Sequence, residues 1–490
     1  MKFSMKNGII AVAIAFCLVV PMGVFAQDQA EPAVQAQGDA QAESEVQFAE
    51  KVEPQSGVHT QAEVLALFRD APATDQDTIK NSEALIEQGK WASAWALLSQ
   101  ADADNSNPYV FAEKIRVALD GYLQTAMHVS FVFTDVPEGK DLATLREEGT
   151  SDPIEPIDFS PATIASSLEE KGEEIPPVLS YMLGNYYYDV WKNYQGQWLL
   201  DDTTILNDGA TEFERAYAYD LYTPVSLDRY SEMLVASQSW EGAKNVILKA
   251  METDPDNLAL TLRLADTYYG LGDYQSMPAL ADKIIADKND RSMLANGYVV
   301  GIEAGLALSN RDMLNAYLDG FENDFPDQYY PTLVRHLVAV NFSDAAAANK
   351  AADAVTASYP GNPDVVRSLV STWLSANDPT SAFNYLNRNL TKEQPDDAYA
   401  ALYFYRALLD VEVGETPERL TQALIDLSKA ESYFKKSYPE GHQVFDMIKS
   451  MQKEWTDKLT EATQGSADAS SSADTVAGDA TQTAPTPAAQ

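Results

Sequence analysis

Four histidines supply the imidazoles that acid–base or metal chemistry would need: His59, His128, His336 and His442. None has a second ligand at metal-binding spacing, and the sequence contains no H-E-x-x-H motif. The segments 432–435 and 450–453 match the S-x-x-K spacing in which a lysine activates a serine, but the companion motifs are missing. A G-x-S-x-G elbow, a P-loop and a dinucleotide fingerprint are also missing. We therefore expect a protein that is not an enzyme and that holds no metal or cofactor.

One segment, 102–113, has the spacing of a calcium-binding loop. Carboxylates and a hydroxyl stand at positions 1, 3, 5 and 12 of an EF-hand pattern: Asp102, Asp104, Ser106 and Glu113. The glycine required at position 6 is replaced by Asn107, and Pro108 follows it. Proline is common at the first position of a helix, where Asp and Ser are ordinary caps. We favour a turn that starts a helix, and calcium binding is the alternative.

Tyrosine and tryptophan are dense between residues 181 and 222. The cluster consists of Tyr181, Tyr186, Tyr187, Tyr188, Trp191, Tyr194, Trp198, Tyr217, Tyr219 and Tyr222. Such rings can stack on sugars or anchor peptides, because each has an apolar body and a polar tip. They also fill protein cores, and core packing is the alternative for each of them. The candidate aromatic binding site comprises Tyr187, Trp191, Tyr194 and Trp198.

The N-terminus has the pattern of a secretory signal peptide. Lys2 and Lys6 precede an uncharged apolar run, and small residues follow it, so we predict cleavage after Ala26. The alternative is an uncleaved anchor, for which the run is short beside the roughly 20 apolar residues of a membrane span. Cys17, the single cysteine, lies inside the run, so the mature chain would have no disulfide. We expect an exported bacterial protein of the periplasm or the cell exterior.

The charge of the chain restricts its partners. There are 34 Lys and Arg residues against 74 Asp and Glu residues, which gives a formal net charge of −40. A chain this acidic repels nucleic acid and anionic lipid surfaces. It suits a basic or neutral protein or peptide, and we include an envelope membrane protein among these partners. The simpler explanation of the charge is solubility.

Composition divides the chain into segments. Residues 1–26 form the predicted signal peptide, and residues 27–60 are predicted as a disordered linker because Ala, Gln, Glu and Pro dominate without apolar periodicity. Residues 462–490, rich in Ala, Ser, Thr and Pro, are predicted as a disordered tail. The folded part is then 61–461, in which a proline-rich stretch, 134–177, is predicted as an irregular insertion with short helices.

The folded part is predicted to be all-α, and its best-matching repeats lie in 224–290. Counted from Pro224, the repeat positions 4, 7, 8, 11, 20, 24, 27 and 32 are Leu227, Tyr230, Ser231, Leu234, Ala243, Ile247, Ala250 and Pro255. A second count from Leu258 gives Thr261, Leu264, Ala265 and Tyr268, with Met277 and Ile284 replacing small residues. This pattern resembles the tetratricopeptide repeat (TPR) family, whose 34-residue units are two antiparallel helices. The resemblance implies a helical-hairpin solenoid that acts as a scaffold for protein–protein interaction.

The resemblance also implies a binding groove. Family members that grip a C-terminal carboxylate use two lysines, an asparagine and an arginine, whereas this chain has Asp228, Glu232 and Ala259 there and keeps only Arg263. An acidic groove repels a carboxylate and suits a basic or neutral partner. The candidate groove residues are Asp228, Glu232, Arg263, Asp266 and Tyr269, and a solvated surface is the alternative.

The function expected from the sequence is that of an exported TPR scaffold. It would bind a protein or peptide in the bacterial cell envelope through the acidic concave groove. The alternative is a glycan-binding or small-molecule-binding protein that uses the Tyr/Trp cluster at 181–222.

Overall fold

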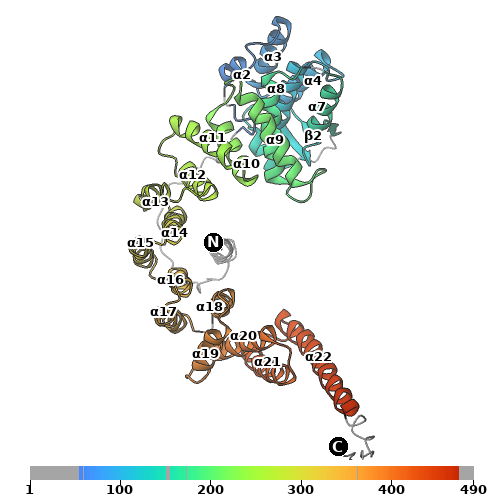
Figure 1. Cartoon of the computed structure of the whole chain (residues 1–490). Helices are drawn as coiled ribbons and strands as arrows, with labels where there is room; N and C mark the ends of the chain where they lie inside the picture. Colours follow the sequence, from blue (N-terminus) through green and yellow to red (C-terminus); the bar gives the residue numbers. More distant parts are fainter. Residues whose placement is uncertain (1–53, 59, 150–154, 173, 361, 474–490) are drawn as a thin grey trace, which may run out of the picture. The chain divides into compact units, whose positions relative to one another are not determined.

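The structure, a computed structural model, consists of two compact units made mainly of helices (Figure 1). It describes residues 54–58, 60–149, 155–172, 174–360 and 362–473. The N-terminal unit extends to Ala304, and the C-terminal unit begins at Gly305. The predicted signal peptide and most of the predicted linker lie outside the described residues, so these assignments stay predictions. In the part of the chain that is described, no helix is both long and apolar enough for a membrane span.

The helices of the N-terminal unit pack as consecutive pairs. They are α2 (Gln61–Leu67), α3 (Ala73–Ile86), α4 (Trp91–Ala101), α5 (Pro108–Gly121), α8 (Pro177–Asn193), α9 (Asp202–Tyr217), α10 (Pro224–Ala236), α11 (Trp240–Thr253), α12 (Leu258–Leu271) and α13 (Met277–Ala286). Helix α14 (Arg291–Ala307) runs across the boundary between the units. The pairs α3/α4, α10/α11 and α12/α13 are helical hairpins joined by short turns, and α8/α9 is a hairpin joined by the longer segment 194–201.

The repeat motif folds as the sequence predicts. Helix α10 begins with Pro224 after the capping residue Thr223, whose side chain accepts a hydrogen bond from the Ser226 N–H. The small residues Ser231 and Ala243 are fully buried, which lets α10 and α11 approach closely. The predicted all-α hairpin solenoid is thereby confirmed as the fold class.

A small sheet that the sequence analysis did not predict begins before the predicted insertion and ends within it. Strands β1 (Tyr122–Ala126), β2 (Ser130–Phe133) and β3 (Ile157–Asp158) pair antiparallel in the order β1-β2-β3. Met127 and His128 form the hairpin turn with φ angles of 53° and 54°. Two short helices follow, α6 (Leu142–Glu148) and α7 (Pro161–Glu170). The irregular region therefore starts at β1, before the predicted boundary of 134.

The C-terminal unit continues the helical hairpins. Its helices are α15 (Arg311–Asp324), α16 (Tyr330–Asn341), α17 (Ala345–Ser358), α18 (Pro363–Ser375), α19 (Pro379–Leu390), α20 (Asp396–Val413), α21 (Pro417–Ser437) and α22 (Gln443–Ala473). The pairs α16/α17, α18/α19 and α20/α21 pack together. Val365, Leu369 and Trp373, which lie four residues apart along α18, are all buried in its core.

Both ends of the folded part differ from the predicted boundaries. Ser56 and Val58 are buried, and the Asp120 carboxylate accepts hydrogen bonds from the Ser56 N–H and hydroxyl at 2.8 and 2.6 Å. The packed chain thus begins before residue 61, because this segment supplies groups that pair with a buried carboxylate. At the other end, α22 continues to Ala473, beyond the predicted limit of 461.

Candidate functional site

The candidate site is formed by the first helices of successive hairpins in the N-terminal unit. We name this surface the first-helix face, and it consists of Tyr188, Lys192, Asp228, Glu232, Arg263, Asp266, Tyr269 and Glu303. Helices α8, α10, α12 and α14 carry these residues. Contacts of α10 with both α8 and α12 bring the predicted groove residues of the two repeats together.

Arg263 joins the two repeats through Asp228. Its Nη1 donates hydrogen bonds to the Asp228 Oδ1 at 2.5 Å and to the Ser231 Oγ at 2.8 Å. Its Nη2 lies 3.9 Å from the Glu232 Oε2. The guanidinium therefore neutralises much of the negative charge that the sequence places in the groove.

Glu232 is paired from a third helix. Its Oε1 accepts a hydrogen bond from the Lys192 ammonium at 2.7 Å, and its Oε2 accepts one from the Tyr188 hydroxyl at 2.6 Å. Burial acts to raise the pKa of Glu232, but these two bonds and the positive charges nearby outweigh it, and the pKa is lowered. The Glu232 carboxylate is thus already paired within the protein.

Asp266 and Glu303 are the open carboxylates of this face. Among the described residues, neither has a hydrogen-bond or ion-pair partner. Burial raises the pKa of Asp266 to about 6, against an opposing effect of Arg263. Burial and then the charge of Asp266 raise the pKa of Glu303 to about 7. The Asp266 side chain is accessible to solvent, although many protein atoms lie around it. A ligand can therefore reach the pair.

Tyr269 lies beside the open carboxylates. Burial, followed by the charge of Glu303, raises the pKa of its hydroxyl to about 12. Its ring meets the ring of Tyr274 edge-on, with centroids 5.5 Å apart. An aromatic ring next to two repelling carboxylates is suited to an ammonium or guanidinium group, which both can attract.

Sequence reasoning missed three residues of this face, namely Tyr188, Lys192 and Glu303. A third count of the 34-residue repeat, from Ser292, would have placed Glu303 at position 12, which the family uses to line its groove. No such count reaches Tyr188 and Lys192, because α8 follows the insertion and lies outside the matching repeats.

The aromatic cluster holds the β-hairpin in place. Tyr187 and Trp191 are 6% and 8% exposed. The Tyr194 hydroxyl bonds the His128 Nδ1 at 2.8 Å, and the Trp198 Nε1 donates to the Met127 carbonyl at 2.7 Å. Tyr187 and Trp191 therefore belong to the core, whereas Tyr194 and Trp198 are partly exposed and bind the hairpin turn through their polar atoms.

The calcium-like segment contains a cation of its own. The buried Lys114 ammonium donates to the Asp102 carbonyl and, at 2.8 Å, to the Asn105 Oδ1. Glu113, the last residue of the EF-hand pattern, instead binds the Arg116 guanidinium at 2.7 Å. In the described ranges, no group of three or more His, Cys, Asp and Glu residues could hold a metal ion.

Two of the described histidines, His128 and His336, are buried. His336 is fully buried, and its Nδ1 lies 3.0 Å from the Ala348 carbonyl. Burial lowers the pKa of His336 to about 4. The His128 Nε2 lies 2.5 Å from the Asp189 Oδ2, so this ring links the hairpin turn to α8.

Comparison with known proteins yields similarities to solved structures only. No family model matches the sequence, and no curated protein matches it. A tetratricopeptide repeat protein from Parabacteroides merdae is 14% identical, covers 56% of this chain and 98% of its own, and has a TM-score of 0.33. PilW, a type IV pilus biogenesis factor, is 13% identical, covers 54% of this chain and 99% of its own, and has a TM-score of 0.27. The TPR domain of P58(IPK) is 12% identical, covers 80% of this chain and 99% of its own, and has a TM-score of 0.22.

The fold is defined by the chain's own features. The motif within 224–290 forms two successive helical hairpins, and further hairpins of the same kind lie on both sides of it in sequence. Small residues are buried where the paired helices cross, and proline or asparagine stands at the helix starts. The chain is therefore an all-α solenoid with the tetratricopeptide repeat fold.

Proposed function

We propose that this protein is an exported scaffold of the bacterial cell envelope that binds a basic segment of a protein partner on the first-helix face. The observation that carries the proposal is the open pair formed by Asp266 and Glu303. The N-terminal pattern of residues 1–26 supports export, and the TPR fold supports a role in protein–protein interaction.

The two unpaired carboxylates of the open pair favour the binding of a cation. The surrounding protein atoms raise the pKa of both carboxyls, although Asp266 is exposed and Glu303 partly exposed, and the charge of Asp266 further raises the pKa of Glu303. A lysine or arginine side chain bound near them would offset their like charges and favour the ionised form of both carboxyls. Asp228 and Glu232 gain less, since Arg263, Lys192 and Tyr188 already bind them.

The test is capture of partners from envelope extract, followed by measurement of affinity for the recovered protein. The variant Asp266→Asn/Glu303→Gln should weaken binding about tenfold or more, because it removes both attracting charges. The matched control Glu241→Gln/Asp256→Asn makes the same change in net charge at two exposed positions on α11 and the following turn, and should bind as the wild type does.

The pH dependence of binding separates this site from general attraction. Protons and a basic partner compete for the open pair, so affinity should fall as the pH is lowered from 8 to 5, through the pKa values near 7 and 6. Equal weakening by the test and control variants, or a partner that binds with no dependence on Asp266 and Glu303, would refute the site.

The glycan alternative has weaker support at the aromatic cluster. Tyr187 and Trp191 are buried, and the polar atoms of Tyr194 and Trp198 bind the hairpin turn. Of the four candidate residues, Tyr194 and Trp198 are partly exposed and would be the ones available to a glycan.

A further inference from the structure

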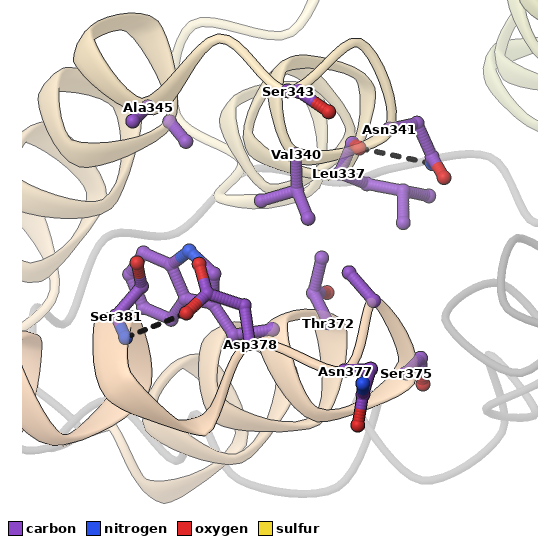
Figure 2. Close-up of a pocket in the computed structure, with 13 residues that line it drawn as sticks. Leu337, Val340, Asn341, Ser343, Ala345, Thr372, Ser375, Asn377, Asp378 and Ser381 are labelled. Carbon is purple, nitrogen blue, oxygen red and sulfur yellow. Dashed lines mark hydrogen bonds between the residues drawn. The ribbon is translucent and has the colours of Figure 1, made fainter.

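A cavity of about 490 Å³ lies in the C-terminal unit, between two helix–helix turns. Figure 2 shows the α16–α17 turn, which carries Ser343, facing the α18–α19 turn, which carries Asn377. Leu337 and Val340 from α16 form an apolar wall, and Trp373 from α18 also lines the space. The volume is within the range of pockets that bind small molecules, roughly 300 to 1,000 Å³.

The cavity is lined by polar groups with unused hydrogen-bonding capacity. Trp373 is 2% exposed, yet its indole N–H has no hydrogen-bond partner among the described residues. The hydroxyls of Ser343, Ser375 and Ser381 likewise have none in that part of the chain, and the same holds for the Asn377 side-chain amide. The indole N–H borders the cavity, so it is free to donate a hydrogen bond to an acceptor of a ligand there.

The backbone of the two turns is already used. The Ser343 N–H donates to the Val340 carbonyl at 2.9 Å, and the Asn377 N–H donates to the Leu374 carbonyl at 2.8 Å. An extended peptide binds chiefly by pairing its main chain with free main-chain groups. Because the turns offer few of these, recognition must come from side-chain hydroxyls, the amides and the indole.

The lining is almost free of charge, although the chain as a whole carries a net charge of −40. No lysine, arginine or histidine is among the lining residues. The single carboxylate, Asp378, accepts a hydrogen bond from the Ser381 N–H at 3.0 Å and thereby caps α19 (Figure 2). An anionic ligand would find no counter-charge, and a cationic one only a carboxylate that is already engaged.

We propose that this cavity binds a neutral saccharide of one or two rings. Sugar hydroxyls both donate and accept hydrogen bonds, as the serine hydroxyls and asparagine amides of the lining do. The apolar wall would cover the C–H faces of a ring, and the indole N–H would donate to a hydroxyl or ring oxygen. The site lies outside the first-helix face, so it is independent of the function proposed above.

The test is titration of the full-length protein with cellobiose and with chitobiose, observed by saturation-transfer NMR and calorimetry. Binding of at least one of them is expected, and glucuronic acid should bind more weakly. Trp373→Phe keeps an aromatic ring in the core and removes the N–H, so affinity should fall about 2- to 12-fold, the value of one hydrogen bond. Because Trp373 packs against His336 and Tyr385, the variant Ser375→Ala/Ser381→Ala provides a second test at exposed or half-buried positions.

A control variant and a competing peptide accompany the saccharide titration. Ser428→Ala removes an exposed hydroxyl on α21, outside the cavity, and should leave saccharide binding unchanged. A synthetic peptide of residues 481–490 tests whether a neutral proline-containing peptide is the better occupant. Lack of binding by both neutral disaccharides at millimolar concentration, or peptide binding in their place, would overturn the proposal.

Discussion

At the residue scale, the charges of the first-helix face show what a sequence can and cannot specify. The repeat count placed Asp228, Glu232 and Arg263 on a common surface, where the structure also brings them together. It could not predict which carboxylates are neutralised, because the partners of Glu232 come from α8, 40 and 44 residues earlier in the chain. Such pairings depend on how the insertion is accommodated and not on local pattern.

Glu303 gives a stability prediction at this scale. Its pKa in the folded protein is about 7, above its ordinary value of 4.5. The folded state therefore binds this proton more tightly, and the associated stability is present at pH 4 and lost as the pH rises through 7. Glu303→Gln removes that loss, so its free energy of unfolding should exceed the wild-type value by about 1 to 2 kcal/mol at pH 8.

Urea unfolding at pH 4 and pH 8 measures this effect. The two proteins should be equally stable at pH 4, where the wild-type carboxyl is protonated. A stabilisation of the same size at both pH values would show that the substitution acts through packing and not through the charge.

At the element scale, helices were predictable and the β-hairpin was not. Prolines, caps and 3.6-residue periodicity mark α10 to α13 and α16 to α19 in the sequence. The hairpin has strands of only five and four residues, and its turn residues, Met127 and His128, lack the Asn-Gly or Gly-Gly pattern that usually indicates such a turn. Its conformation is held instead by distant groups, above all Trp198 and Tyr194.

Trp198→Phe is therefore expected to loosen the hairpin. The substitution removes the hydrogen bond to the Met127 carbonyl and should cost about 1 kcal/mol. Hydrogen exchange of the amides in 122–133 should accelerate, while exchange in α10 and α12 stays as in the wild type. Trp455→Phe, a change of the same kind in the buried face of α22, serves as the control and should leave the hairpin unaffected.

At the scale of the whole molecule, each unit has a hydrophobic core of its own. The core of the N-terminal unit includes Phe111, Tyr186 and Leu227, and a core of the C-terminal unit includes Leu369, Trp373 and Tyr385. Repeat hairpins contact chiefly their neighbours, so stability in such proteins is local. Composition and period predicted this class of architecture, but the limits of the folded part depended on contacts such as that of Ser56 with Asp120, which no local pattern shows.

Leu369→Ala tests the locality of stability. Leu369 is fully buried, so the cavity left by the substitution should cost about 2 to 4 kcal/mol. Faster hydrogen exchange is expected in α16 to α20, with α8 to α12 unchanged. Acceleration of similar size in both units would show that they unfold together.

The turn between α4 and α5 takes its cation from the polypeptide itself. An EF-hand must bind an ion from its surroundings. In this turn the Lys114 ammonium, a group of the polypeptide, binds the oxygen atoms instead. We therefore expect the segment to complete its fold without calcium from its surroundings.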